Sequence, residues 1–143
     1  MWRCSELVPL VTEHRVGTYV FHDRNTIAAG AATLADAALT IHATVVSRPA
    51  PLRAILDAGS KSLAADPGPD RLGGLVLEAP GSRVARLNEE HAVMELAPGE
   101  ELELGQRVHV VPNHACAAVN LHETLLLERG GEPAGCWPVA RGR

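Results

Sequence analysis

The sequence has few positive charges that could gather into a surface patch. Lys61 is the only lysine, and the remaining basic residues are arginines scattered along a chain of formal net charge -4. Proteins bind a phosphate backbone mainly through clustered lysine and arginine side chains. We therefore exclude nucleic acid as a partner.

Long hydrophobic runs are also absent. No apolar stretch approaches the length needed to span a bilayer, and residues 1–6 lead into no uninterrupted apolar segment of the kind found in secretion signals. We therefore expect a soluble, cytoplasmic protein that makes no contact with a membrane.

Cysteine is scarce. Cys4, Cys116 and Cys136 are an odd number of thiols at wide spacing, which is not the pattern of a secreted disulfide scaffold. We expect free thiols or a metal ligand.

The residues that are present suit one folded domain. Hydrophobic residues make up 46% and charged residues 21% of the 143 residues, which is too apolar for a disordered chain. A chain of this length can bury roughly two-thirds of the surface that its unfolded form exposes.

The pattern of short segments changes near Thr40. Before it, two extended pieces at residues 7–11 and 18–21 precede an alanine-rich stretch, Thr26 to Ala38, which predicts a short helix. After it, β-prone runs alternate with proline and glycine breaks at the spacing of an antiparallel sandwich or barrel. The predicted strands are residues 41–47, 53–57, 74–78, 83–87, 92–96, 107–111 and 124–128, with a longer exposed loop at 66–70.

His114 and Cys116 follow the predicted strand 107–111 in the motif Pro-Asn-His-Ala-Cys. In extended backbone, side chains two positions apart share a face. Imidazole and thiolate on one face could hold a Zn²⁺ ion. The spacing alone favours a simpler interpretation, an ordinary buried cysteine beside a hydrogen-bonded histidine.

Three other polar positions have both a functional and an ordinary interpretation. His91, after Glu89 and Glu90, is a candidate for acid-base chemistry, but a solvated hairpin explains the same cluster. Lys61 could form a Schiff base, although a lone exposed lysine is more often a solubilising charge. The turn at Gly17 could offer backbone amides to an anion, which one glycine alone does not establish.

The remaining histidines that stand alone among their neighbours are interpreted as structural. These are His14, His22, His42 and His109.

Four segments, taken in order, resemble the family of D-threonine aldolases and eukaryotic-type D-serine dehydratases: residues 12–21, 56–61, 89–91 and 112–116. Residues 136–142 also resemble the family's usual ending. The resemblance covers nearly all of this chain but only the last part of a family member. It implies a pyridoxal-phosphate enzyme of fold type III, similar to alanine racemase, in which an α/β barrel precedes a β domain.

On this resemblance, residues 1–40 would be the remnant of the barrel's last strand and helix, and residues 41–143 a metal-binding β barrel or sandwich domain. Gly17 and Thr18 would donate backbone amides to the phosphate of pyridoxal phosphate. His114 and Cys116 would bind a divalent metal beside a small D-amino acid substrate. Cysteine in place of aspartate at the second position implies zinc.

Two departures from the family pattern affect the expected function. Val16 replaces the proline that stiffens the phosphate turn. The family's Schiff-base lysine lies near the start of its barrel, and Lys61, in a β-domain segment, does not replace it. We therefore expect a metal-binding domain of a lyase for D-β-hydroxy-amino acids that is inactive alone, with His91 its only candidate catalytic group.

The alternative is a non-catalytic interaction domain that pairs with a full-length relative. In both cases we expect a homodimer or association with a barrel-bearing partner, and dehydratase and aldolase chemistry both stay open.

Overall fold

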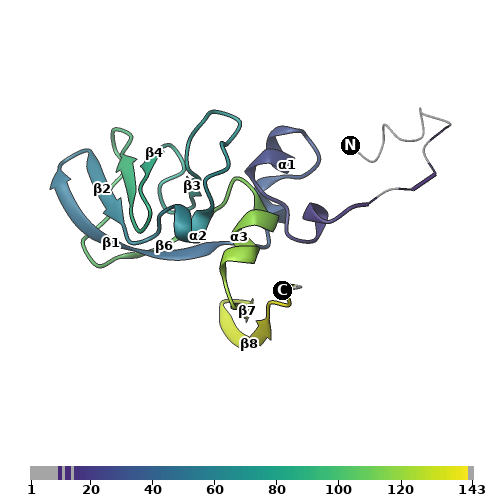
Figure 1. Ribbon diagram of the computed structural model, residues 1–143. Coiled ribbons are helices and arrows are strands. Elements are labelled where there is room, and N and C mark those ends of the chain that lie inside the picture. The colour runs from purple at the N-terminus through teal and green to yellow at the C-terminus, as the bar shows by residue number, and fades with distance from the viewer. Residues whose placement is uncertain (1–9, 11, 14, 142–143) are drawn as a thin grey trace.

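The computed structural model describes residues 10, 12–13 and 15–141. Six strands of this part form one sheet in the spatial order β3-β6-β1-β2-β5-β4 (Figure 1), and every neighbouring pair is antiparallel. The mainly β fold predicted from the sequence is confirmed. The strands are β1 Ile41–Ala50, β2 Arg53–Leu56, β3 Leu75–Val76, β4 Arg83–Leu87, β5 Ala92–Glu95 and β6 Arg107–Val111.

The sheet curls until its two edge strands approach each other. The Gly73 amide, just before β3, donates to the Val84 carbonyl of β4 at 2.9 Å. A Cβ on Gly73 would lie 2.7 Å from Leu87 Cγ and 2.9 Å from Val84 Cγ1, so a larger residue would push the edges apart. The sheet is therefore nearly closed and barrel-like.

Alternation along β1 decides which side chains enter the barrel. Ile41, Ala43 and Val45 are buried, whereas His42 and Val46 lie on the outer face. Neighbouring strands add fully buried side chains to the same core, among them Leu56, Met94, Val108 and Val110.

The loops that follow β2 and β4 are joined through their backbones. The amides of Ser60 and Lys61, which begin helix α2 (Ser60–Leu63), donate to the carbonyls of Asn88 and Glu89 at 2.8 and 3.0 Å. A Cβ on Gly59 would lie 2.3 Å from the Asn88 oxygen and 2.4 Å from the Glu89 oxygen. Both contacts are with backbone, so no side-chain movement can relieve them.

The segment before β1 consists of short helical turns. These are the 3-10 turn η2 (Thr18–Val20), helix α1 (Arg24–Ala28) and the 3-10 turn η3 (Leu34–Asp36). None of the helices among the described residues has the length and apolar character needed to cross a membrane.

Two predictions for this segment were wrong. The piece at 18–21, predicted to be extended, is the turn η2. The helix predicted for 26–38 is the shorter and earlier α1, because the chain turns at Gly30 with a positive φ of 70°. Most of the other predicted extended piece, residues 7–11, lies outside the described residues.

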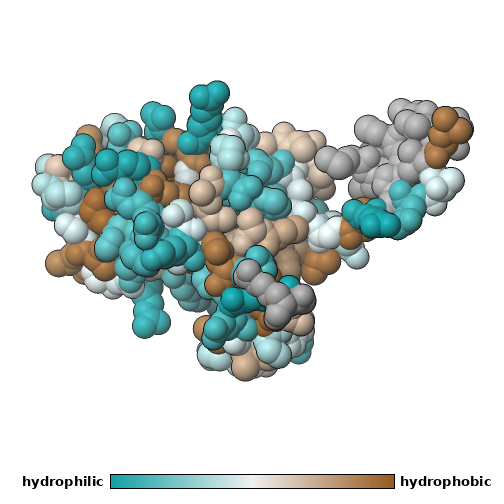
Figure 2. Space-filling view, in the orientation of Figure 1, coloured by the Kyte–Doolittle hydropathy of each residue, from teal (hydrophilic) through white to brown (hydrophobic). Residues whose placement is uncertain are grey.

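Helix α3 (Ala115–Leu121) leads from the sheet to a separate hairpin of β7 (Thr124–Arg129) and β8 (Glu132–Pro138). Neither α3 nor β8 was predicted from the sequence. In Figure 1 the hairpin lies below the sheet, and Figure 2 shows polar and apolar residues intermixed on the visible surface of the hairpin.

The hairpin buries little of its own surface. Every residue of β8 is exposed, and Leu126 and Trp137 are 82% and 58% exposed. Leu125 packs against a small buried cluster of Leu39, Ala115 and Ala118. This contact connects the hairpin to α3.

Candidate metal site at the junction of strand β6 and helix α3

His114 and Cys116 lie where β6 gives way to α3. His114 caps the helix with extended backbone (φ -137°, ψ 100°), and Cys116 is the second residue inside the helix. The extended backbone assumed for both positions is therefore correct for His114 and wrong for Cys116. Strand geometry therefore does not place the two side chains on one face, and each side chain contacts a different partner.

Asp66 holds the His114 ring. The ring Nδ1 lies 3.0 Å from Asp66 Oδ1, and the two side chains are 40% and 42% exposed. A carboxylate accepts hydrogen bonds, so in the neutral ring a hydrogen on Nδ1 leaves the lone pair on Nε2. This is the usual arrangement around a metal-binding histidine. From the sequence, Asp66 was predicted only to lie in an exposed loop, because a contact across 48 positions leaves no local pattern.

The Cys116 thiol contacts Thr18. Its Sγ lies 3.3 Å from the Thr18 hydroxyl, across 98 positions of sequence, and the cysteine is exposed and free. Thr18 is one of the two residues that the resemblance gave to a phosphate turn. Gly17 caps the same turn, with open space where a Cβ would be. The structure therefore brings two separately predicted sites into contact.

Asn113 anchors the junction from within. It is 2% exposed, and its Oδ1 accepts a hydrogen bond from Arg24 Nη1 at 2.8 Å. Its Nδ2 donates to the backbone carbonyls of Asp66 and Leu72 at 3.0 and 2.7 Å. A buried amide with all these partners fixes the Asp66 loop against the junction.

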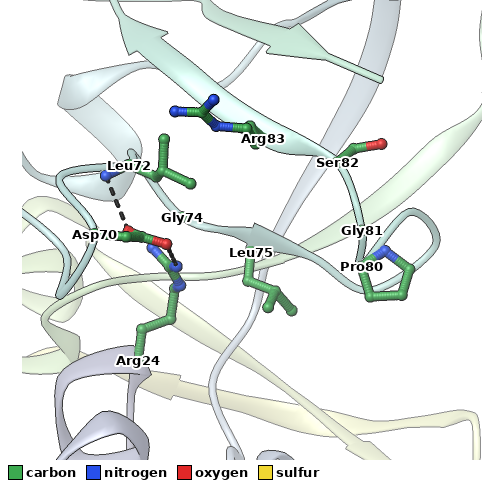
Figure 3. Close-up of a pocket in the computed structure, with 9 residues that line it drawn as sticks. All are labelled: Arg24, Asp70, Leu72, Gly74, Leu75, Pro80, Gly81, Ser82 and Arg83. Atoms are coloured by element: carbon green, nitrogen blue, oxygen red, sulfur yellow. Dashed lines mark hydrogen bonds and ion pairs between the residues drawn. The ribbon is translucent and has the colours of Figure 1, made fainter. Parts of the chain in front are cut away.

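Arg24 borders a cleft of about 420 Å³ beside the junction (Figure 3). Its Nη2 donates to Asp70 Oδ2 at 2.7 Å, and only 10% of the Arg24 side chain is exposed. The hydrogen bond from Arg24 outweighs partial burial and lowers the pKa of Asp70 below its ordinary value of 3.8. Arg83 lies on the opposite wall. The Arg24 guanidinium is thus already paired, which suits it to hold the loop.

Asp23 joins the amino-terminal segment to α3. Its side chain is 1% exposed, and Oδ2 accepts a hydrogen bond from the Ala115 amide at 2.9 Å. Oδ1 accepts from the Thr26 amide at 2.8 Å, so one carboxylate caps both α1 and α3. Two backbone bonds, from the Arg24 and Asn25 amides to residues 112 and 113, add to this joint. The contact between Asp23 and Ala115 spans 92 positions and leaves no local pattern in the sequence.

The other predicted residues lie apart from this junction. The charged groups of Glu90 and Glu89 lie 2.8 and 3.0 Å from Lys61 Nζ, and hydrogen bonds to Glu90 and then Glu89 raise the lysine pKa above 10.5. His91 is exposed, and the described residues show no hydrogen bond from its ring to His114 or Cys116. Within the described part of the chain, no three histidine, cysteine or acidic side chains form a group that could hold a metal.

The fold and junction define a class of protein: a β domain whose last core strand runs into a helix that is capped by a histidine and has a cysteine in its first turn. Residues 38–127 match the family described as "Putative serine dehydratase domain". The match covers more than half of the chain, and the chain belongs to this family.

Two relatives in sequence differ in length. The D-threonine aldolase of Arthrobacter sp is 37% identical over 135 residues, which are 92% of this chain and 35% of that enzyme. An uncharacterised protein of Mycobacterium tuberculosis is 35% identical over 128 residues, which are 85% of this chain and 96% of that protein. The chain therefore spans about a third of the aldolase but nearly all of a short relative.

Solved structures share the fold. The D-threo-3-hydroxyaspartate dehydratase from Delftia sp. HT23 superposes with a TM-score of 0.78 and 30% identity, over 92% of this chain and 40% of that one. That enzyme has also been solved as a cysteine-to-alanine variant in the metal-free form. An alanine racemase-like protein from Idiomarina loihiensis gives a TM-score of 0.76 at 26% identity, over 90% of this chain and 38% of that one. The predicted alanine racemase-like fold is confirmed.

Proposed function

We propose that this chain is the metal-binding β domain of a lyase for D-β-hydroxy-amino acids, with His114 and Cys116 as the metal ligands. The domain would comprise residues 41–143, and residues 1–40 would correspond to the last strand and helix of the relatives' barrel. The contact between Asp66 and His114 carries the proposal, because it leaves the ring Nε2 available two positions before an exposed thiol.

The relatives support the class of substrate. A D-threonine aldolase and a D-threo-3-hydroxyaspartate dehydratase are named for D-amino acids that bear a hydroxyl group on the β carbon. The metal-free form of the dehydratase's cysteine variant supports a role for a cysteine in metal binding in this family. We propose the same class of substrate and a metal-binding cysteine for this chain.

The donor set fits zinc, which prefers imidazole nitrogen and thiolate sulfur. A bound divalent ion would act as a Lewis acid toward the substrate's β-hydroxyl. His114 Nε2 and Cys116 Sγ would hold the ion, and Asp66 would fix the ring in the correct tautomer. The Thr18 hydroxyl can donate to the thiolate. Two protein ligands leave the other positions to water and substrate.

The residues present do not fit covalent attachment of pyridoxal phosphate. A Schiff base forms on a neutral amine. Lys61, the only lysine, is exposed and has a raised pKa because Glu90 and Glu89 stabilise its charged form. We therefore propose that the isolated chain has no lyase activity.

Cobalt substitution tests the metal site. Co²⁺ bound to Cys116 should give a thiolate-to-cobalt charge-transfer band that saturates at one ion per chain and is lost in Cys116→Ala. The control is Cys136→Ala, which removes the other exposed free thiol of the described residues. A band that survives Cys116→Ala, or that disappears only in Cys136→Ala, would show that the site is assigned to the wrong thiol.

Asp66→Asn tests the support of the ring. The amide can no longer accept as a carboxylate does, and losses of about 10–100-fold in metal affinity are usual for such partners. Competition against a chelator measures the change. An unchanged affinity would remove Asp66 from the site while leaving His114 and Cys116 to be judged by the cobalt band.

Activity is tested separately. With pyridoxal phosphate, zinc, and D-threonine or D-serine, we expect no release of glycine or pyruvate. A saturable cofactor band that is lost in Lys61→Ala, together with product release, would make the chain an enzyme by itself.

The exposed hairpin favours a second role, association with another copy or with a barrel-bearing partner. Leu126 and Trp137 expose apolar surface that a partner could cover. Light scattering of the purified chain should show a dimer or larger species that Leu126→Ser with Trp137→Ser converts to monomer. A monomer at all concentrations would count against the homodimer.

A further inference from the structure

A pair of histidines lies on the outer face of the sheet, away from the core. His42 on β1 and His109 on β6 are direct cross-strand partners in the antiparallel register. Directly opposed residues have Cβ atoms about 4.5–5.5 Å apart, so their side chains meet. Their neighbours Ile41, Ala43, Val108 and Val110 are buried on the opposite face. The sheet therefore presents both imidazoles outward at one fixed position.

The two rings are close and differently oriented. Their centroids are 4.4 Å apart and their planes meet at 82°. Both histidines were predicted to be structural because each stands alone in the sequence. Strand pairing joins residues 67 positions apart, which no local pattern could reveal.

Glu78 orients the His109 ring. Its Oε1 lies 2.5 Å from Nδ1 of His109, and its Oε2 accepts a hydrogen bond from the His109 amide at 2.9 Å. Burial raises the pKa of Glu78, but the hydrogen bonds from the His109 side chain and backbone outweigh it and lower the pKa below 4.5. In the neutral ring, the hydrogen bond from Nδ1 to this carboxylate leaves the lone pair on Nε2.

The pair opens into a groove between the sheet and the β7–β8 hairpin. The groove measures about 850 Å³ and is lined by both histidines and by His122, Leu77 and Leu125. The His122 Nε2 is 3.0 Å from the Ser62 carbonyl, so that nitrogen is occupied. The groove has room for water or a small ligand beside the rings of His42 and His109.

We propose that His42 and His109 form a second, independent site for a divalent transition-metal ion of the imidazole-binding class, such as Zn²⁺ or Ni²⁺. Neutral imidazole is a preferred ligand of these ions, and a carboxylate on the second nitrogen is the usual support. Because no group of three protein donors exists among the described residues, water or a ligand in the groove completes the coordination. This site does not depend on His114 or Cys116.

Nuclear magnetic resonance of the histidine rings in the full chain tests the site directly. As Zn²⁺ is added, the ring signals of His42 and His109 should shift together and saturate with one common dissociation constant. Each histidine ring gives its own signal, so zinc binding at His114 does not obscure the response of His42 and His109. If neither signal responds, or if the two follow different curves, the proposal is wrong.

Two variants separate ligation from packing. His42→Phe keeps an aromatic ring against His109 but removes the nitrogen, and should weaken zinc binding at His109 at least about tenfold. Glu78→Gln should weaken it by about 10–100-fold. If His42→Phe fails to fold, His42→Gln replaces it. Unchanged zinc binding at His109 in the folded His42 variant would mean that the two rings only pack together.

Discussion

The barrel-like sheet and the β7–β8 hairpin are both antiparallel β structure, yet only the sheet has a core. Val45, Leu56, Met94 and Val108 of the sheet are fully buried, whereas every residue of β8 is exposed. The sheet closes on itself through the contact of Gly73 with Val84. A two-stranded hairpin has no second layer and is only marginally stable alone. In this chain, side chains are therefore buried where the sheet closes on itself, and the pairing of two strands in a hairpin is not enough to bury them.

The largest expected effect comes from the core of the sheet. Met94→Ala removes a fully buried side chain and should lower the free energy of unfolding by about 2–5 kcal/mol. Urea denaturation followed by circular dichroism measures the loss. A cost below about 1 kcal/mol would mean that the sheet is loosely packed and differs less from the hairpin than its burial indicates.

Helix α3 joins the two regions, and Asp23 caps it. Asp23→Ala leaves the buried amide of Ala115 without its partner, and should cost about 1–3 kcal/mol. Hydrogen exchange should show faster exchange at the Ala115 amide. The control is Asp36→Ala, which removes an exposed cap of the turn η3. If both variants lose the same stability, Asp23 has no special role at the joint.

A smaller effect on stability is expected on the outer face of the sheet, and it should depend on pH. The lowered pKa of Glu78 means that its stabilising contribution is complete above the ordinary value of 4.5 and is lost as the pH falls through the lowered value. Glu78→Gln should therefore lose up to about 1 kcal/mol at neutral pH and much less in acid. Urea midpoints at several pH values test this. A pH-independent difference would show that the effect comes from shape alone.

The smallest effect should come from the hairpin. Leu126 is 82% exposed, so Leu126→Ala should change the stability of the monomer by less than about 0.5 kcal/mol. The contrast with Met94→Ala is measured in the same urea experiment. A cost comparable to that of Met94→Ala would mean that a partner or another copy covers the hairpin in solution.

How much the sequence could predict differs between the two regions for the same reason. Strands such as 83–87 and 92–96 carry apolar residues and end at polar or glycine breaks, so their positions were predicted within a residue or so. Strand β8 contains Pro133, Gly135 and Pro138, and has no inward face to impose alternation. Strand β8 is defined by its pairing with β7, and the residues of β8 alone do not reveal that pairing.

The candidate site follows the same division. His114 and Cys116 were predicted as metal ligands because they lie together in one motif. Asp66, Thr18 and Asp23 approach them across 48, 98 and 92 positions, counted to His114, Cys116 and Ala115 respectively. Such contacts are decided by the packing of the sheet and the amino-terminal turns. Sequence could therefore indicate the candidate ligands but not the side chains that contact them.

The close approach at Gly59 bears on how the segment 56–61 should be used to recognise distant relatives. Its Cβ would overlap the backbone oxygens of the loop after β4, while Lys61 and its acidic partners meet in solvent, where substitutions cost little. During evolutionary drift the charges can be exchanged or lost, but the glycine cannot be replaced without moving a second loop. In a search for remote homologues, Gly59 is therefore the most informative residue of the segment 56–61.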